Sequence, residues 1–204
     1  MDMPEEFREL LERFDTLSFI QASSLPEIDL YMDQLTTFME DRLKDQRRYP
    51  EDKILTKTMI NNYTKNRLLP PPVKKKYSQD HLVTLLYTYY LKSIISIGDI
   101  TTLLAPMSER YWDRHREDPA EAGHSMKDIY ARILTLAPGM SEDFRADLEH
   151  KMEAALTLFS QEDLTEEERD YLQKFTLCTQ LACDVYLKKK IIERIIDDMK
   201  KEEE

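Results

Sequence analysis

The sequence predicts an all-α protein with at most a minimal β wing. Only three glycines occur among the 204 residues, whereas a sheet-rich fold with many tight turns needs more of them. Apolar residues make up 41% of the chain, which is enough for a packed core. They recur at helical spacing along the chain, and the segments that they define are separated mostly by prolines.

Charge is distributed unevenly along the chain. The net charge of −11 and the pI near 5.0 argue against non-specific wrapping of nucleic acid. Residues 1–52 hold 6 basic and 14 acidic side chains, residues 53–105 hold 8 and 2, and residues 106–204 hold 15 and 24. A basic island between acidic flanks suits a protein that touches phosphate at one place. From charge alone, however, a solvated lysine face is the better interpretation.

Several classes of function find no support in the sequence. The histidines are scattered, and the glycine motifs of phosphate loops and nucleophile elbows are absent. We therefore expect no enzyme activity, no metal and no cofactor. The acidic N-terminus lacks the apolar core of a signal peptide, and no apolar run approaches a membrane span. Cys178 and Cys183 are expected to be buried and unpaired, which favours a cytoplasmic location.

Periodicity and capping signals divide the chain into three segments. Residues 1–28 are expected to form an N-terminal helix over 4–14 and a connector, residues 29–105 a domain that contains the basic island, and residues 106–204 a helical region. In the middle segment we expect helices over 29–48 with Asp29 as N-cap, over 56–66 with Thr56 as N-cap, from Ser78, and from Ser96 to a stop at Pro106. The last segment is predicted to hold helices over 107–117, 125–136, 141–160 and 165–200.

The stretch from Lys53 to Leu104 has the outline of a helix-turn-helix unit with a small wing. The helix over 56–66 turns Met59, Ile60 and Tyr63 inward, and it is too short to be stable without packing. Its outward side chains are Lys57, Thr58, Asn61, Asn62 and Lys65. An asparagine amide can pair bidentately with adenine in the major groove. The alternative is that these asparagines belong to a fraying helix end.

This stretch resembles the DNA-binding domain of the MerR family. The shared order is a short helix with a tyrosine, Leu-Leu-Pro-Pro, a basic wing ending in Tyr-Ser, and an amphipathic helix. The chain is more similar to a bacterial domain-of-unknown-function family with a MerR-like variant. That family shows Asn-Asn-Tyr-Thr-Lys, Leu-Leu-Pro-Pro-Pro-Val-Lys-Lys and a segment like Leu30 to Gln34. The likeness covers about residues 25–105 and implies a winged helix-turn-helix-like N-terminal half followed by a C-terminal helical bundle.

The resemblance also implies roles for individual residues. Asn61 stands where MerR proteins place a phosphate- or base-contacting arginine, and Tyr63 matches a tyrosine near the DNA backbone. The wing corresponds to Lys74, Lys75, Lys76 and Tyr77. Arg67 replaces the glycine that ends the recognition helix in MerR proteins, so we expect that helix end to take another form. The wing lacks an Asn-Gly turn, which leaves open whether it forms a β-hairpin.

The last helix suggests how the protein assembles. A helix of about 35 residues is about 50 Å long, which is more than a region of this size can bury. We therefore expect its apolar end at residues 191–199 to meet a partner chain, and we expect a homodimer through the C-terminal helices. A small-molecule effector would find aromatic side chains near Tyr111, Trp112 and Met126.

Together these observations predict a bacterial DNA-binding transcriptional regulator. Its helix over 56–66 would enter the major groove of double-stranded DNA, and Lys65, Arg67 and the wing lysines would neutralise phosphates. One alternative is a helical protein-interaction module that retains the fold without binding DNA, supported by the acidic total and the proline run. Another is a helical small-molecule sensor.

Overall fold

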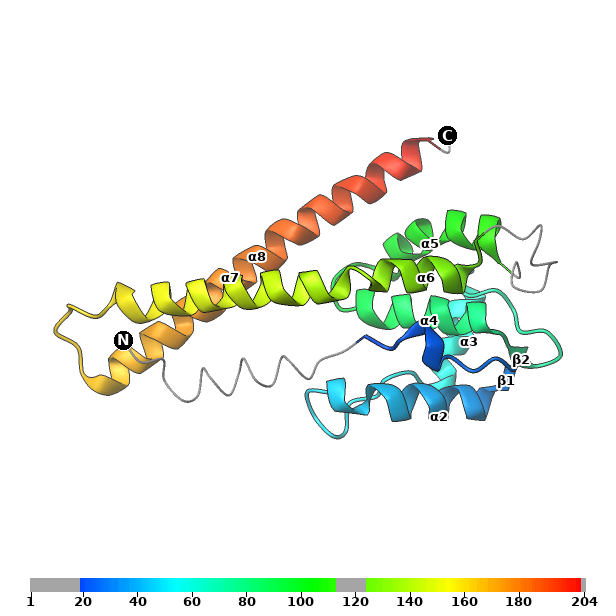
Figure 1. The fold of residues 1–204 in the computed structure, drawn as a ribbon, viewed down its shortest axis with the longest axis horizontal. Helices are drawn as coiled ribbons and strands as arrows, with labels where there is room; N and C mark the ends of the chain where they lie inside the picture. Colours follow the sequence, from blue (N-terminus) through cyan, green and yellow to red (C-terminus); the bar gives the residue numbers. More distant parts are fainter. Residues whose placement is uncertain (1–18, 113–123, 203–204) are drawn as a thin grey trace. The chain divides into compact units, whose positions relative to one another are not determined.

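A computed structural model describes residues 19–112 and 124–202. The described chain is helical apart from one two-stranded antiparallel sheet, so the predicted all-α class with a minimal β element is confirmed. Contacts divide it into two compact units (Figure 1). The larger unit comprises Ile20–Leu134 with Glu193–Glu204, and the smaller unit contains Thr135–Ile192. The helix predicted over residues 4–14 lies outside the described residues.

The larger unit contains the sheet and the helices of the predicted DNA-binding domain. In chain order its elements are η1 (Ala22–Ser24), β1 (Leu30–Tyr31), α2 (Met32–Leu43), η2 (Lys44–Gln46), α3 (Lys57–Lys65), β2 (Lys76–Tyr77), α4 (Gln79–Leu91), α5 (Ile97–Tyr111) and α6 (Met126–Leu134). Its core is formed by fully buried side chains from each of the five α-helices, including Leu35, Met39, Ile60, Leu82, Leu85, Ile100 and Tyr130.

The segment before α2 is a strand and not the first turn of a helix. Leu30 pairs with Tyr77 and Tyr31 pairs with Lys76, which requires an extended backbone here. The predicted helix over 29–48, with Asp29 as its N-cap, is therefore wrong at both ends. Helix α2 begins at Met32 and ends at Leu43, and η2 follows it.

Two predicted caps of the larger unit, Thr56 and Ser96, are confirmed. The Thr56 hydroxyl accepts a hydrogen bond of 3.1 Å from the Met59 N–H at the start of α3. The Ser96 hydroxyl accepts one of 3.1 Å from the Asp99 N–H at the start of α5. Such bonds satisfy N–H groups that have no partner inside a helix, and they depend only on local sequence.

Helix α5 continues through Pro106 to Tyr111, so the predicted stop at Pro106 is wrong. Proline lacks the N–H that would bond to the carbonyl four residues earlier, which weakens a helix at that point. Both ends of α5 are nevertheless anchored. Ser96 caps the first turn, and the Trp112 ring meets the His81 ring edge-on with 4.7 Å between centroids. We infer that these contacts outweigh the missing bond.

Helix α6 belongs to the larger unit, although we expected it in the C-terminal helical region. Its Tyr130 side chain is 2% exposed, and the hydroxyl donates a hydrogen bond of 2.7 Å to the Ile20 carbonyl. The Tyr130 ring packs edge-on against Tyr87. Burial raises the pKa of Tyr87 to about 12 and also raises the pKa of Tyr130. This tyrosine therefore ties the start of the described chain to α6.

Replacing Tyr130 with Phe is expected to lower the free energy of unfolding by about 1–3 kcal/mol, because the Ile20 carbonyl loses its partner inside the core. Urea denaturation followed by circular dichroism measures this change. Tyr49→Phe removes the same hydroxyl from a side chain that is 49% exposed, and it should change stability by less than about 0.5 kcal/mol. Equal effects of the two substitutions would show that the buried bond contributes nothing.

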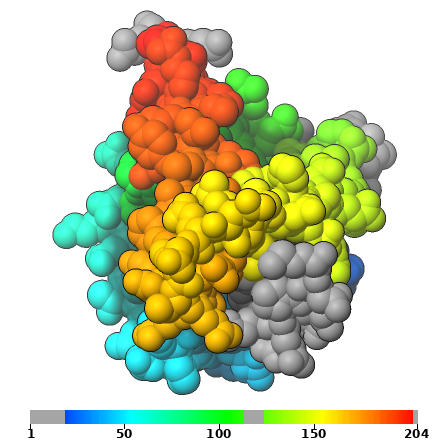
Figure 2. Space-filling model, turned by 90° about the vertical axis from the view of Figure 1, so that its left-hand side faces the viewer, coloured from blue at the N-terminus to red at the C-terminus, as the bar shows by residue number. Residues whose placement is uncertain are grey.

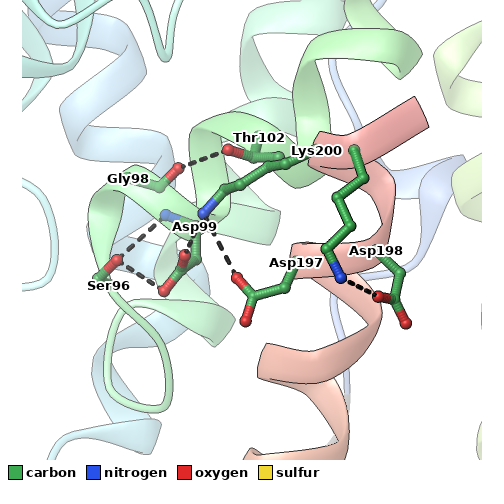
Figure 3. Close-up of polar contacts among 8 residues, drawn as sticks. Ser96, Gly98, Asp99, Thr102, Asp197, Asp198 and Lys200 are labelled. Carbon is green, nitrogen blue, oxygen red and sulfur yellow. Dashed lines mark hydrogen bonds and ion pairs between the residues drawn. The ribbon is translucent and has the colours of Figure 1, made fainter. Parts of the chain in front are cut away.

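The C-terminal end of helix α8 (Glu166–Glu202) packs within the larger unit. Ile196 is 1% exposed, and the Lys200 ammonium lies 3.2 Å from the Asp99 carboxylate (Figure 3). A hydrogen bond from the Ser96 hydroxyl, reinforced by Lys200, lowers the pKa of Asp99. Part of the apolar end that we expected to meet a partner chain is thus buried by the protein itself.

The smaller unit is formed by α7 (Ala137–Leu158) and the first part of α8. Pro138 lies in the first turn of α7, where its missing N–H costs nothing. The predicted start of this helix at Ser141 is therefore wrong. The two helices share a small core formed by Leu148, Met152, Ala155, Leu156 and Leu177. Lys151 joins them through an ion pair of 2.7 Å with Asp184.

Cys178 and Cys183 are both exposed on α8, so the prediction that they are buried is wrong. The helical period places them away from Leu177 and Leu181, which pack against the α7 core. Among the described residues, no helix has the length and apolar character needed to cross a membrane.

Candidate nucleic-acid interface

Helix α3 presents a polar face supported by a buried apolar one. Ile60 is fully buried and Met59 is partly buried, which holds this nine-residue helix against the core. The side chains predicted to face DNA are all exposed, namely Lys57, Thr58, Asn61, Asn62 and Lys65. The structure therefore leaves on one helix the amides and ammonium groups that could meet base edges and phosphates.

Two of the predicted contact residues lie under this surface. Tyr63 is 7% exposed and Tyr77 is 3% exposed, and burial raises the pKa of each hydroxyl. Their rings support α3 and β2 from within. We therefore assign them a structural role in this conformation and not direct contact with a ligand.

Helix α3 ends in a Schellman motif with Arg67 in the left-handed region. The Leu68 N–H donates to the Tyr63 carbonyl (3.0 Å) and the Arg67 N–H to the Thr64 carbonyl (3.2 Å), which is the bonding pattern of that motif. Arg67 has φ of 60° and is exposed. The expectation that an arginine here would force another kind of helix end is wrong, because the backbone keeps the geometry that glycine usually adopts.

The wing is a tight two-residue turn. The Val73 N–H donates to the Lys76 carbonyl (3.1 Å), and the Lys76 N–H donates to the Val73 carbonyl (2.9 Å). Lys74 and Lys75, between them, have φ of 50° and 64°. Positive φ at both central residues is the signature of a type I′ hairpin turn, which normally selects Asn-Gly. The wing therefore closes as a minimal hairpin even though that sequence is absent.

Strand pairing fixes the wing beside the start of α2. The Lys76 ammonium lies 5.3 Å from the centre of the Tyr31 ring in β1. Two residues further, Asp33 forms an ion pair with Lys57 at the start of α3. The first turns of α2 and α3 and the wing are thus neighbours. Tyr31, which is 52% exposed, is a candidate contact residue that the sequence analysis did not identify.

Every non-glycine residue with positive φ in the described chain is a cation of this surface. They are Arg67, Lys74 and Lys75. For a side chain other than Gly, Asn or Asp, this conformation costs about 1 kcal/mol or more. If these three positions served only to form turns, glycine or asparagine at them would make the fold more stable. The presence of long cationic side chains at strained positions points to a role for their charge.

The basic island itself contributes few acidic side chains that could cancel this charge. The basic island at residues 53–105 contains two acidic residues, Asp80 and Asp99. Asp80 is fully buried, and Asp99 is bonded to Ser96 and Lys200. From outside the island, Asp33 forms an ion pair with Lys57 of this surface.

His81 holds the wing and the proline run to the start of α4. Its Nδ1 accepts a hydrogen bond of 2.9 Å from the Ser78 N–H, and its Nε2 lies 3.2 Å from the Pro70 carbonyl. Because Nδ1 is an acceptor, the ring proton is on Nε2 and faces that carbonyl. The ring, 2% exposed, also meets Tyr77 edge-on. One side chain therefore connects three segments of the candidate interface.

Residues that we expected near a small-molecule site instead pack within the fold. Met126 is fully buried, and the Trp112 ring packs on His81. A cavity of about 470 Å³ lies instead at the C-terminal end of α4. Its lining includes the side chains of Arg47, Arg48, Lys53, Tyr89 and Lys92.

A family model matches most of the larger unit. No curated protein and no solved structure matches the chain. The family model described as a domain of unknown function, DUF1836, matches residues 20–133, which is more than half of the chain. The matched region corresponds to the continuous part of the larger unit. The chain therefore belongs to the DUF1836 family.

Proposed function

We propose that this protein is a DNA-binding transcriptional regulator with a MerR-like helix-turn-helix. Helix α3 would enter the major groove, with Asn61 and Asn62 at base edges. Lys65, Arg67 and the wing lysines would lie on the phosphates of the same duplex. The observation that supports this proposal most strongly is that Arg67, Lys74 and Lys75 occupy left-handed conformations that glycine would adopt without strain.

The neighbouring contacts support the same proposal. Lys57 and Lys76 both lie beside the first residues of α2, through Asp33 and Tyr31 respectively. A single duplex could therefore meet the start of α3 and the wing together. One such unit offers few base contacts, so a dimer on two half-sites is expected.

Selection from a random duplex library, followed by salt titration of the best site, tests the proposal. Six exposed or partly exposed cations, namely Lys57, Lys65, Arg67 and Lys74 to Lys76, are available per protomer. If all six neutralise phosphates, the logarithm of the association constant should fall with the logarithm of salt concentration with a slope of about −5 per protomer. Failure to enrich any duplex, or a slope shallower than about −1, would favour the helical protein-interaction module.

A further inference from the structure

Helix α8 has an exposed apolar face in the smaller unit, on the side away from α7. This face forms a shallow concavity of about 440 Å³, which we call the α8 seam, lined by Phe175, Cys178, Thr179, Ala182, Cys183 and Tyr186. The aromatic side chains at its two ends are 57% and 60% exposed. The opposite side of α8 packs on α7, because Leu177 is buried in the core that the two helices share. In Figure 2, α7 and the first part of α8 form the yellow and orange surface.

The α8 seam is symmetric along the sequence. Its midpoint falls between residues 180 and 181, and each lining residue has a counterpart at equal distance on the other side. Phe175 mirrors Tyr186, and Thr179 mirrors Ala182. In an antiparallel pair of α8 helices, a two-fold axis through this midpoint would therefore place aromatic side chains against aromatic ones and small side chains against small ones. A surface that matches itself in this way is what an isologous dimer requires.

The order of side-chain sizes suits close packing of two helices. The centre of the seam holds small residues, so two backbones could approach to about 8 Å, the short end of the usual range for helix pairs. At the flanks, the Tyr171 and Phe175 rings stack with 6.1 Å between centroids, and the Lys190 ammonium lies 5.8 Å from the centre of the Tyr186 ring. In an antiparallel pair of helices, Tyr171 and Phe175 of one chain would face Tyr186 and Lys190 of the other. Tyr171 would then lie opposite Lys190, which is a cation–π arrangement.

Charge selects the antiparallel direction. Residues 166–170 hold four acidic side chains and one basic one, whereas residues 188–194 hold four basic and one acidic. Antiparallel helices would place these segments within about one turn of each other. Parallel helices would place acidic against acidic and basic against basic, which is unfavourable.

We propose that the α8 seam is the dimer interface of this protein, with α8 of a second copy of this chain lying antiparallel across it. The interface is about 30 Å long, because it involves about 20 residues at 1.5 Å each. This inference specifies the dimer of the proposed function, but it rests on the surface of α8 alone. Its test uses no DNA, so the two proposals can fail separately.

Site-directed disulfide formation tests the direction of pairing. In a chain whose two cysteines are replaced by Cys178→Ser and Cys183→Ser, a single cysteine is introduced as Phe175→Cys in one preparation and as Tyr186→Cys in another. The two preparations are mixed under reducing conditions and then exposed to oxidised glutathione. We expect a covalent dimer from the mixture and not from either preparation alone, because identical positions would be about 16 Å apart along the axis. The second Phe175–Tyr186 contact of the mixed dimer stays intact.

Other outcomes of this experiment would contradict the proposal. Cross-linking of each preparation with itself would indicate parallel helices. Absence of any cross-link, with a dimer still observed by sedimentation equilibrium, would place the interface elsewhere. A monomeric unmodified protein at micromolar concentration would exclude a second copy as the partner.

A charge substitution tests the seam without cysteines. Phe175→Glu should raise the dimer dissociation constant at least about 100-fold, because each dimer loses two buried aromatic contacts. Leu158→Glu on α7 is the matched control, since Leu158 is 61% exposed and lies outside the seam. Both variants should keep the helical circular dichroism of the parent. Equal dissociation constants for the two variants would overturn the assignment.

Discussion

Replacing Lys74 with Asn and Lys75 with Gly is expected to make the protein more stable and a weaker binder of DNA. The new residues suit the type I′ turn that the wing already forms, so the strain at two left-handed positions disappears. The gain should be about 1–2 kcal/mol in the free energy of unfolding. The loss of two phosphate contacts should reduce the salt slope of DNA binding by about 1.8 and weaken binding roughly tenfold or more at low salt.

This pair of opposite effects separates function from folding. Urea denaturation and a gel-shift salt titration, on the duplex selected for the parent protein, measure the two quantities. Lys44→Asn with Lys201→Asn removes the same charge from exposed positions of η2 and α8, and it should leave the salt slope unchanged. A stabilised variant with unaltered affinity and slope would show that the wing does not touch DNA. A destabilised variant would show that the turn is not of the I′ type.

Replacing His81 with Ala is expected to cost about 3–5 kcal/mol in the free energy of unfolding, a large part of a typical domain's stability. The substitution leaves the Ser78 N–H and the Pro70 carbonyl without their partner and opens a cavity between Tyr77 and Trp112. Denaturant unfolding monitored by circular dichroism measures the effect.

His81→Gln is the informative control for this prediction. Glutamine at the third helical position can accept from the Ser78 N–H, as in an ordinary capping box, but it does not replace the aromatic contacts. We expect it to retain about half of the stability that alanine loses. A loss below about 1 kcal/mol for His81→Ala would mean that the wing and the proline run are held by other contacts.

Features set by neighbouring residues were predicted well from the sequence. The hydroxyls of Thr56, Ser96 and Thr165 begin helices as expected, because an N-cap bond spans only three residues. The exposed and buried faces of α3 also followed from its period. In each case the interactions that decide the conformation form between residues within one or two helical turns of each other.

Features set by distant partners were not predicted. Leu30 and Tyr31 are extended because they pair with β2, far along the chain, and no local signal indicates that pairing. Pro106 is a helix breaker by local chemistry, yet α5 is held on both sides of it. The sequence indicated the charge of Arg67 and Lys74 but not their backbone conformation, which is what singles them out in the structure. Exposure of Cys178 and Cys183 reflects which face of α8 packs on α7, a tertiary choice.

The hydrogen bond between Tyr130 and Ile20 has a consequence for the synthesis of the protein. Its partners are 110 residues apart, and a ribosome adds about 5–20 residues per second. About 5–20 s therefore pass between the emergence of the first partner and that of the second. During this interval α2 to α5 can assemble locally, but the surfaces that α6 covers stay open. A contact of such long range closes late in folding, so the nascent chain would expose those surfaces to chaperones or to other nascent chains until α6 has emerged.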